Sequence, residues 1–249
     1  MLNNKMIKIP KKFMGKPIKG SLEKVLANID KAQQEPIPEP NPTTASDKQD
    51  FIYVPKVGVY LAKQRIHLKL DWYETHKALH QENLRMPTIP EFIEYLNYLK
   101  TDYQKQGQEQ KQEAEQILDD ILTVRSPWRS EWLDARFEEK GGNKKIYVHY
   151  NHKIVGGELK PQNTEELLDD NLKADCWADI FNPNKQGLPT KKSGNSYKQG
   201  ENAYFLYPIA GRVVRFDMGL DGAGFICNRI PLYSNPGLGV FSVCEAKGL

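Results

Sequence analysis

The stretch from Arg212 to Phe241 reads RVVRFDMGLDGAGFICNRIPLYSNPGLGVF, and its composition differs from that of the preceding chain. The chain is rich in Lys, Glu and Gln, yet none of these three residue types occurs from Phe216 to Cys244. Gly, Asn, Asp and single apolar residues take their place. Because the side chains of an extended chain alternate between its two sides, the pattern predicts strands whose two faces have different roles.

Residues 213–244 separate into two interleaved sets. The inward set consists mostly of residues that pack, turn or fix the backbone: Val213, Val214, Arg215, Phe216, Ala223, Phe225, Cys227, Arg229, Pro231, Ser234, Pro236, Leu238, Gly239, Val240 and Val243. The outward set has no shared chemistry: Asp217, Gly219, Asp221, Gly224, Ile226, Asn228, Ile230, Leu232, Asn235, Gly237, Phe241 and Ser242. We expect the inward set to anchor the ribbon and the outward set to face solvent.

The outward set differs from the side chains that usually cover an exposed strand. Such strands carry Lys, Glu, Thr and Gln, which keep the edge soluble and discourage pairing with other chains. Here Ile226, Ile230, Leu232 and Phe241 take outward positions. A contiguous exposed apolar patch marks a binding surface, so we expect one here. Burial on both faces would account for these four residues, but not for the aspartates among them.

The sequence upstream of this stretch predicts strands, then three helices, then a hairpin. Residues 51–70 are rich in β-branched and aromatic residues and are broken at Pro55 and Gly58. Capping boxes predict that helices start after Asp71 and after Thr88, and residues 109–124 have helical periodicity. A Gly-Gly pair at 156–157 predicts the turn of a hairpin. Helices followed by irregular strands indicate an α+β fold.

Residues 1–50 have the composition of a tail and linker. Seven Lys against one Glu make residues 1–24 basic, and Pro occupies every second position from 36 to 42. Alternating prolines favour an extended, semi-rigid chain, while residues 21–34 could form a short helix. We place the domain boundary near residue 50, which leaves residues 51–249 as one domain.

Bulk properties narrow the class of protein. A formal net charge of +3 provides no general cationic field for nucleic acid. Three scattered cysteines do not form a disulfide framework, and no run of 18 apolar residues exists to span a membrane. The N-terminus lacks the apolar stretch of a secretory signal. We therefore expect a soluble protein that stays in the cytoplasm or is associated with a virion.

Candidate catalytic and metal sites are weak in this sequence. His76 and His80 lie four residues apart on a predicted helix, but no third potential ligand lies at a spacing typical of a metal site, so we expect none here. Cys176 and Cys227 have no neighbouring base, which favours core roles over nucleophilic ones. We interpret the aromatic residues around Trp128 and Trp132 as a wall of the core. No catalytic residue and no cofactor is expected.

The C-terminal stretch resembles the variable region of variable proteins encoded by diversity-generating retroelements, particularly the archaeal and viral group. The resemblance rests on SNPxLGV at residues 234–240 followed by EAK at 245–247, with RVxRF and the anchors GA, C, R and P before it. In that family, error-prone reverse transcription rewrites adenines, chiefly at AAC codons. Changes in the first two bases of AAC never produce Lys, Glu, Gln, Met or Trp, and the outward set contains none of these.

The resemblance implies a C-type lectin fold, with helices flanking a small, irregular antiparallel sheet that displays the diversified residues. It also implies a non-catalytic protein that binds varied macromolecular targets, chiefly proteins, through the outward set. The reverse transcriptase acts on the gene and not on the protein. Calcium-mediated sugar binding is not expected, because residues 216–244 contain no Glu-Pro-Asn or Gln-Pro-Asp motif.

Two alternatives remain open at this point. Sulfatase-modifying oxidases, which generate formylglycine, resemble the same fold, and fold alone does not decide function. The basic N-terminus could instead contact nucleic acid, although no aromatic residues are interleaved there for stacking on bases.

Overall fold

The computed structural model describes residues 12–13, 16–17, 48–141 and 145–245. The chain divides into two compact units, residues 1–42 and 43–249. In the first unit, strands β1 (Lys12–Phe13) and β2 (Lys16–Pro17) pair antiparallel. The helix considered for residues 21–34 and the Pro-rich segment lie outside the described residues.

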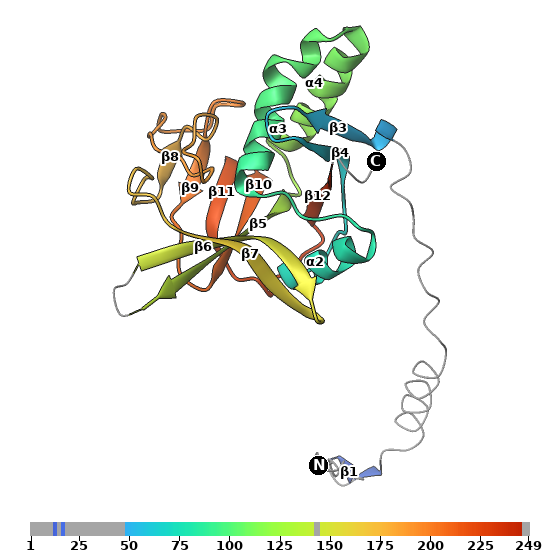
Figure 1. Cartoon of the computed structure of the whole chain (residues 1–249), viewed down its shortest axis with the longest axis vertical. Coiled ribbons are helices and arrows are strands. Elements are labelled where there is room, and N and C mark those ends of the chain that lie inside the picture. Colours follow the sequence, from blue (N-terminus) through green and yellow to red (C-terminus); the bar gives the residue numbers. More distant parts are fainter. Residues whose placement is uncertain (1–11, 14–15, 18–47, 142–144, 246–249) are drawn as a thin grey trace. The chain divides into compact units, whose positions relative to one another are not determined.

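The second unit has a mixed α+β fold, which confirms the predicted class (Figure 1). Its α-helices are α2 (Trp72–Gln81), α3 (Ile89–Thr101) and α4 (Gln108–Leu122). Its strands are β3 (Phe51–Val54), β4 (Val59–Ile66), β5 (Arg129–Lys140), β6 (Lys145–Val155), β7 (Glu158–Glu166), β8 (Cys176–Ala178), β9 (Ala203–Leu206), β10 (Arg212–Gly219), β11 (Gly222–Arg229) and β12 (Leu238–Glu245).

These strands form one open sheet that is larger than the small antiparallel sheet we expected. The main order is β3-β4-β12-β5-β10-β11-β9-β8, and β6 and β7 extend from β5. Most neighbours are antiparallel, but β12 pairs parallel with β5 and β11 pairs parallel with β9. The sheet is therefore mixed, whereas a small, irregular antiparallel sheet was expected. β5 and β12 lie far apart in sequence, and β9 pairs with β11 past the intervening strand β10, so local patterns reveal neither pairing.

Local sequence signals place the helix starts and the hairpin correctly. The Asp71 carboxylate accepts a hydrogen bond from the Glu74 amide at 2.8 Å, and the Glu74 carboxylate accepts one from the Asp71 amide at 3.0 Å. A second capping box is formed at the start of α3. At the β6–β7 turn, Gly156 and Gly157 have φ of 63° and 81°, a left-handed conformation that glycine adopts without strain.

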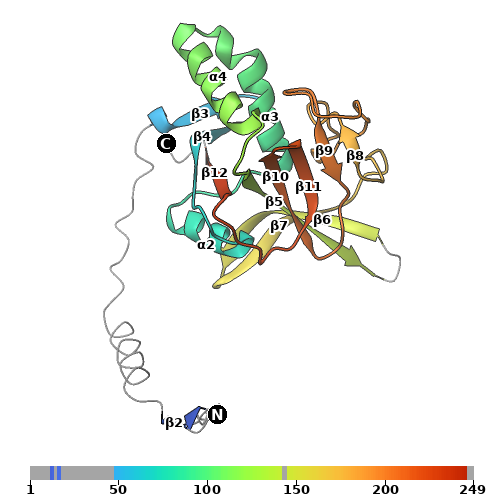
Figure 2. The same cartoon turned by 180° about the vertical axis from the view of Figure 1, so that it is seen from behind.

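Two hydrophobic clusters hold the sheet and helices together. In the larger cluster, Phe92 of α3 lies 5.5 Å from Phe216 of β10 and 6.3 Å from Phe241 of β12, measured between ring centroids. The smaller cluster gathers around Trp72 of α2 and Trp132 of β5. Figure 2 shows α3 and α4 beside one end of the sheet and α2 apart from them. Trp132 is thus a core residue, as predicted.

Candidate functional site

The β10–β11 hairpin has one face in the core. The residues of this core face are at most 2% exposed: Val214, Phe216, Met218, Ala223, Phe225 and Cys227. All but Met218 belong to the predicted inward set, and they pack in the larger hydrophobic cluster. This side of the ribbon anchors it, as the alternation predicts.

The opposite face of the hairpin continues across five strands as one row of paired residues. Asp217 of β10 pairs with Ser130 of β5 on one side and with Gly224 of β11 on the other. Gly224 pairs with Tyr204 of β9, which in turn pairs with Trp177 of β8. Because paired residues of neighbouring strands point to the same face, polar and aromatic side chains flank a glycine in the middle of this row.

An open groove of about 550 Å³ lies on this face of the sheet, with Gly224 in its lining. Five predicted outward residues line it: Asp217, Gly219, Asp221, Gly224 and Ile226. Aromatic walls come from Trp128, Trp177, Tyr204 and Tyr233. We call this hollow the aromatic groove. Gly219 and Gly222, which pair across the hairpin, also line it.

Sequence reasoning missed the aromatic walls of the groove. Trp177 lies on β8, which a long connection separates from β9, and Tyr204 lies on β9, which pairs with β11 and not with its sequence neighbour β10. Their spacing in sequence therefore gives no signal. Trp128 was assigned to the core, but its side chain is partly exposed and lines the groove. Only sheet pairing reveals that these residues belong with the C-terminal stretch.

A partly buried ion pair lies on the groove floor. Arg215 Nη2 donates to Asp217 Oδ2 at 2.7 Å, and Ser130 Oγ donates to Asp217 Oδ1 at 2.5 Å. Burial raises the pKa of the Asp217 carboxyl above its ordinary value, although Arg215 and Ser130 favour the charged form. Burial likewise lowers the pKa of the Arg215 guanidinium. The pair therefore holds two charges in a poorly solvated position.

Arg215 lies on the groove face, although we assigned it to the inward set. Its guanidinium carbon lies 5.2 Å from the Trp128 ring centroid and 5.3 Å from that of Tyr233. Within the described residues, its Nε and Nη1 atoms make no hydrogen bond of good geometry, although Tyr233 also favours the charged guanidinium. Buried donors of this kind favour an acceptor on an incoming ligand.

The remaining outward residues lie beyond the groove. Ile230 and Leu232, in the segment after β11, are 50% and 70% exposed, and Asn228 and Asn235 are partly exposed. Gly237 has little room for a larger side chain, because a Cβ there would lie 2.8 Å from the Trp128 carbonyl oxygen. The exposed apolar residues Ile230 and Leu232 extend the candidate surface past the groove.

The outward assignment of Phe241 and Ser242 is wrong, because each is only 1% exposed. Both residues lie on β12, which is hydrogen-bonded to β4 on one side and to β5 on the other. The Phe241 ring packs against Phe92 and Tyr95 of α3. Alternation continues along β12, but both of its faces are covered.

The histidines and cysteines considered from sequence differ in their surroundings. His76 is buried, and burial lowers its pKa to about 4, whereas His80 on the same helix is exposed. All three cysteines are free, and burial raises the pKa of the Cys176 and Cys227 thiols. Neither thiol is activated, because the reactive thiolate is disfavoured at both positions.

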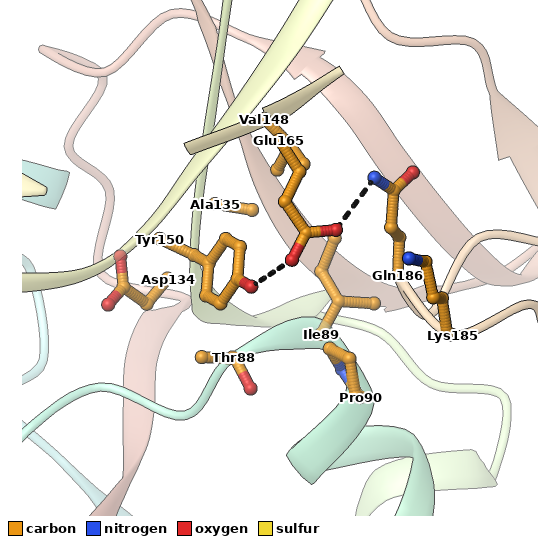
Figure 3. Close-up of a pocket in the computed structure, with 10 residues that line it drawn as sticks. All are labelled: Thr88, Ile89, Pro90, Asp134, Ala135, Val148, Tyr150, Glu165, Lys185 and Gln186. Atoms are coloured by element: carbon orange, nitrogen blue, oxygen red, sulfur yellow. Dashed lines mark hydrogen bonds between the residues drawn. The ribbon is translucent and has the colours of Figure 1, made fainter. Parts of the chain in front are cut away.

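A second, smaller cavity of about 80 Å³ lies between the start of α3 and strands β6 and β7 (Figure 3). Tyr150 donates to Glu165 at 2.5 Å, and Gln186 donates to the same carboxylate at 3.3 Å. Glu165 thus has partners for both oxygens, and the cavity is hardly larger than a few water molecules. We assign it no ligand.

Comparisons with protein-family models, with curated proteins and with solved structures gave no match. In the described part of the chain, no helix is long and apolar enough to cross a membrane.

Proposed function

We propose that this protein is a variable ligand-binding protein of a diversity-generating retroelement, built on a C-type lectin fold. Its binding surface is the aromatic groove together with the exposed segment that carries Ile230 and Leu232. The outward residues on this surface set which macromolecule is bound, and protein targets fit it best. The observation that carries the proposal is that five outward residues line one open groove whose opposite face is core.

The chemistry of the groove suits protein targets. Tyr and Trp supply large contact areas at a low entropic cost, and they are enriched among residues that dominate binding energy. The walls of the groove are of this kind, while its floor holds the unpartnered donors of Arg215. A rigid sheet beneath exchangeable side chains keeps the ordering cost of binding low.

The same surface does not favour the two alternatives. An oxidase would need a reactive thiol, and the Cys227 side chain is fully buried. The nucleic-acid alternative concerns the basic N-terminus, and the groove gives it no support, because phosphates would meet the like charges of Asp217 and Asp221 there. We therefore propose a binding protein that catalyses no reaction.

A pair of matched libraries tests the proposal. The outer library randomises Asp217, Gly219, Asp221, Ile226, Asn228, Ile230 and Leu232 with the residue types that AAC mutagenesis allows. The control library randomises the core-face residues Val214, Phe216, Met218, Ala223, Phe225 and Cys227 in the same way. Each is displayed and selected on hen lysozyme and on streptavidin, and clones are assayed for cooperative thermal unfolding.

We expect most outer-library clones to unfold cooperatively and to yield different binders for the two targets. Core-face clones should rarely fold, because polar or small residues there remove buried packing. Outer clones that fold as rarely as core-face clones, or that fold and never bind, would contradict the proposal.

The retroelement itself is tested separately, in the DNA around the gene. We expect a near-duplicate of the codons for residues 213–244 that differs at adenines, beside a reverse transcriptase gene. If the outer library yields binders but no such duplicate exists beside the gene, the result would support a binding protein outside the retroelement class.

A further inference from the structure

Three side chains from separate elements converge at a buried site away from the aromatic groove. His76 lies on α2, Asp134 on β5 and His152 on β6, and all three are buried. One potential ligand atom from each residue lies within 4.8 Å of the other two. His152 Nδ1 lies 2.5 Å from Asp134 Oδ1, and His76 Nε2 lies 3.6 Å from the same oxygen.

The hydrogen bonds at this site leave one buried nitrogen without a partner. The His152 ring and its backbone amide both contact the Asp134 carboxylate. His76 Nε2 makes no hydrogen bond to any described residue, although its side chain is only 3% exposed. A buried polar atom without a partner is costly, so this nitrogen favours a hydrogen-bonding group or an ion beside it.

Among the described residues, Asp134 forms ion-pair contacts only with His76 and His152, and no Lys or Arg reaches it. A buried carboxylate needs a counter-charge. A divalent cation between the three groups would supply it and would also give His76 Nε2 a partner.

We propose that His76, Asp134 and His152 bind one divalent transition-metal ion of the zinc class. Two imidazole nitrogens and one carboxylate oxygen are a donor set that zinc and its neighbours prefer. Metal–ligand bonds of about 2.1 Å place tetrahedral ligand atoms roughly 3.4 Å apart. The 3.6 Å separation is close to this value, whereas the 2.5 Å contact widens when the metal replaces the proton held between His152 and Asp134. That proton moves by exchange with solvent to Nε2 of His152, so the ring that binds the metal through Nδ1 stays neutral.

The surroundings of the three residues suit a metal site. Trp72 packs edge-on against the rings of His76 and His152, with centroids 4.3 Å and 5.0 Å away, which restrains both imidazoles. His76 and His152 also line a cleft of about 650 Å³, which provides a path for the ion and room for a water ligand. Figure 3 shows the Asp134 carboxylate turned away from the small cavity beside it. The bound ion would tie α2 to the sheet.

The test uses the full chain after dialysis against EDTA. Zn²⁺ is titrated by calorimetry, Co²⁺ is added while visible absorption is recorded, and thermal unfolding is followed with and without Zn²⁺. We expect one ion per chain, visible cobalt bands and a rise in Tm. His76→Gln and Asp134→Asn should each weaken Zn²⁺ binding at least tenfold, because each removes a ligand.

His80→Gln is the matched control, because His80 lies on the same helix and lines the same cleft without joining the cluster. We expect it to bind Zn²⁺ as the unchanged chain does. Equal losses in His80→Gln and His76→Gln would overturn the proposal, as would an unchanged chain that binds Zn²⁺ more weakly than about 100 μM. The comparison of His80→Gln with His76→Gln and the Zn²⁺ affinity of the unchanged chain can both be measured even if Asp134→Asn fails to fold.

Discussion

The β10–β11 hairpin and strand β12 come from the same C-terminal stretch and alternate in the same way, but only the hairpin has a free face. On β12, Phe241 and Val243 enter the larger hydrophobic cluster, while Leu238 and Val240 enter the smaller one. On the hairpin, Phe216 and Phe225 are buried, whereas Asp217 and Ile226 line the aromatic groove. Alternation therefore separates two faces, but neighbouring elements decide whether either face reaches solvent.

This difference divides the outward set into two groups with opposite tolerance to change. Most positions on the hairpin and in the following segment accept substitution with little effect on packing, because their side chains point to solvent or into the groove. The exceptions are Asp217, which is ion-paired with Arg215, and Gly237, which lies close to Trp128. Positions on β12 do not accept substitution, since each side chain there fills space between layers. Substitutions on the two strands measure this difference directly.

The largest effect is expected for Phe241→Ser, a change that AAC mutagenesis would allow. Loss of a fully buried ring and introduction of a hydroxyl should lower the free energy of unfolding by about 4 kcal/mol or more. Urea denaturation of the purified variant provides the measurement. A loss below about 1 kcal/mol would return Phe241 to the tolerant group.

Phe225→Ala, on the core face of β11, should lower the free energy of unfolding by about 3 kcal/mol, because its ring packs beside Phe205 at 6.0 Å. The neighbouring Ile226→Ala is the control, and it should cost about 1 kcal/mol or less because its side chain is only partly buried. Equal losses for the two variants would contradict the two-faced hairpin.

Asp217→Ala tests the ion pair on the groove floor. Removing the carboxylate leaves Arg215 poorly solvated and without its counter-charge, so we expect a loss of about 1–3 kcal/mol. The double variant Asp217→Ala with Arg215→Met should recover part of that loss, and a double-mutant cycle by urea denaturation measures the coupling. A coupling near zero would mean that the pair contributes nothing to stability.

The smallest effect is expected for Leu232→Ser. This side chain is 70% exposed, so the free energy of unfolding should change by no more than about 0.5 kcal/mol. Thermal unfolding monitored by circular dichroism is sufficient. A drop in Tm as large as that of Phe225→Ala would show that the segment after β11 packs on the body of the domain.

The sequence predicted those parts of the fold that depend on nearby residues. The structure confirms the capping boxes at Asp71 and Thr88, the Gly-Gly turn and the core face of the hairpin. Each of these features follows from a pattern of residues within a few positions of one another. The sequence predicted that Phe241 faces solvent and that Trp128 belongs to the core, and the structure contradicts both predictions. Both positions depend on which strand lies next to which, and parallel pairing with distant segments leaves no periodic signal.

The proposed metal site shows the same division. Sequence spacing directed attention to His76 and His80, one turn apart on α2, and offered no third ligand. The structure instead places His76 beside Asp134 and His152, which lie 58 and 76 positions further along the chain by residue number. Folding of α2 against β5 and β6 was needed to bring them together.

By itself, the sequence determined where helices begin, where the chain turns and which side of the β10–β11 ribbon faces the core, because these follow from the local geometry of helices and strands. Only the tertiary structure decided that β12 is covered on both faces, that aromatic residues from distant strands wall a groove and that two histidines meet one buried carboxylate. These features arise from long-range packing, which brings together residues whose separation in sequence carries no information about their contact.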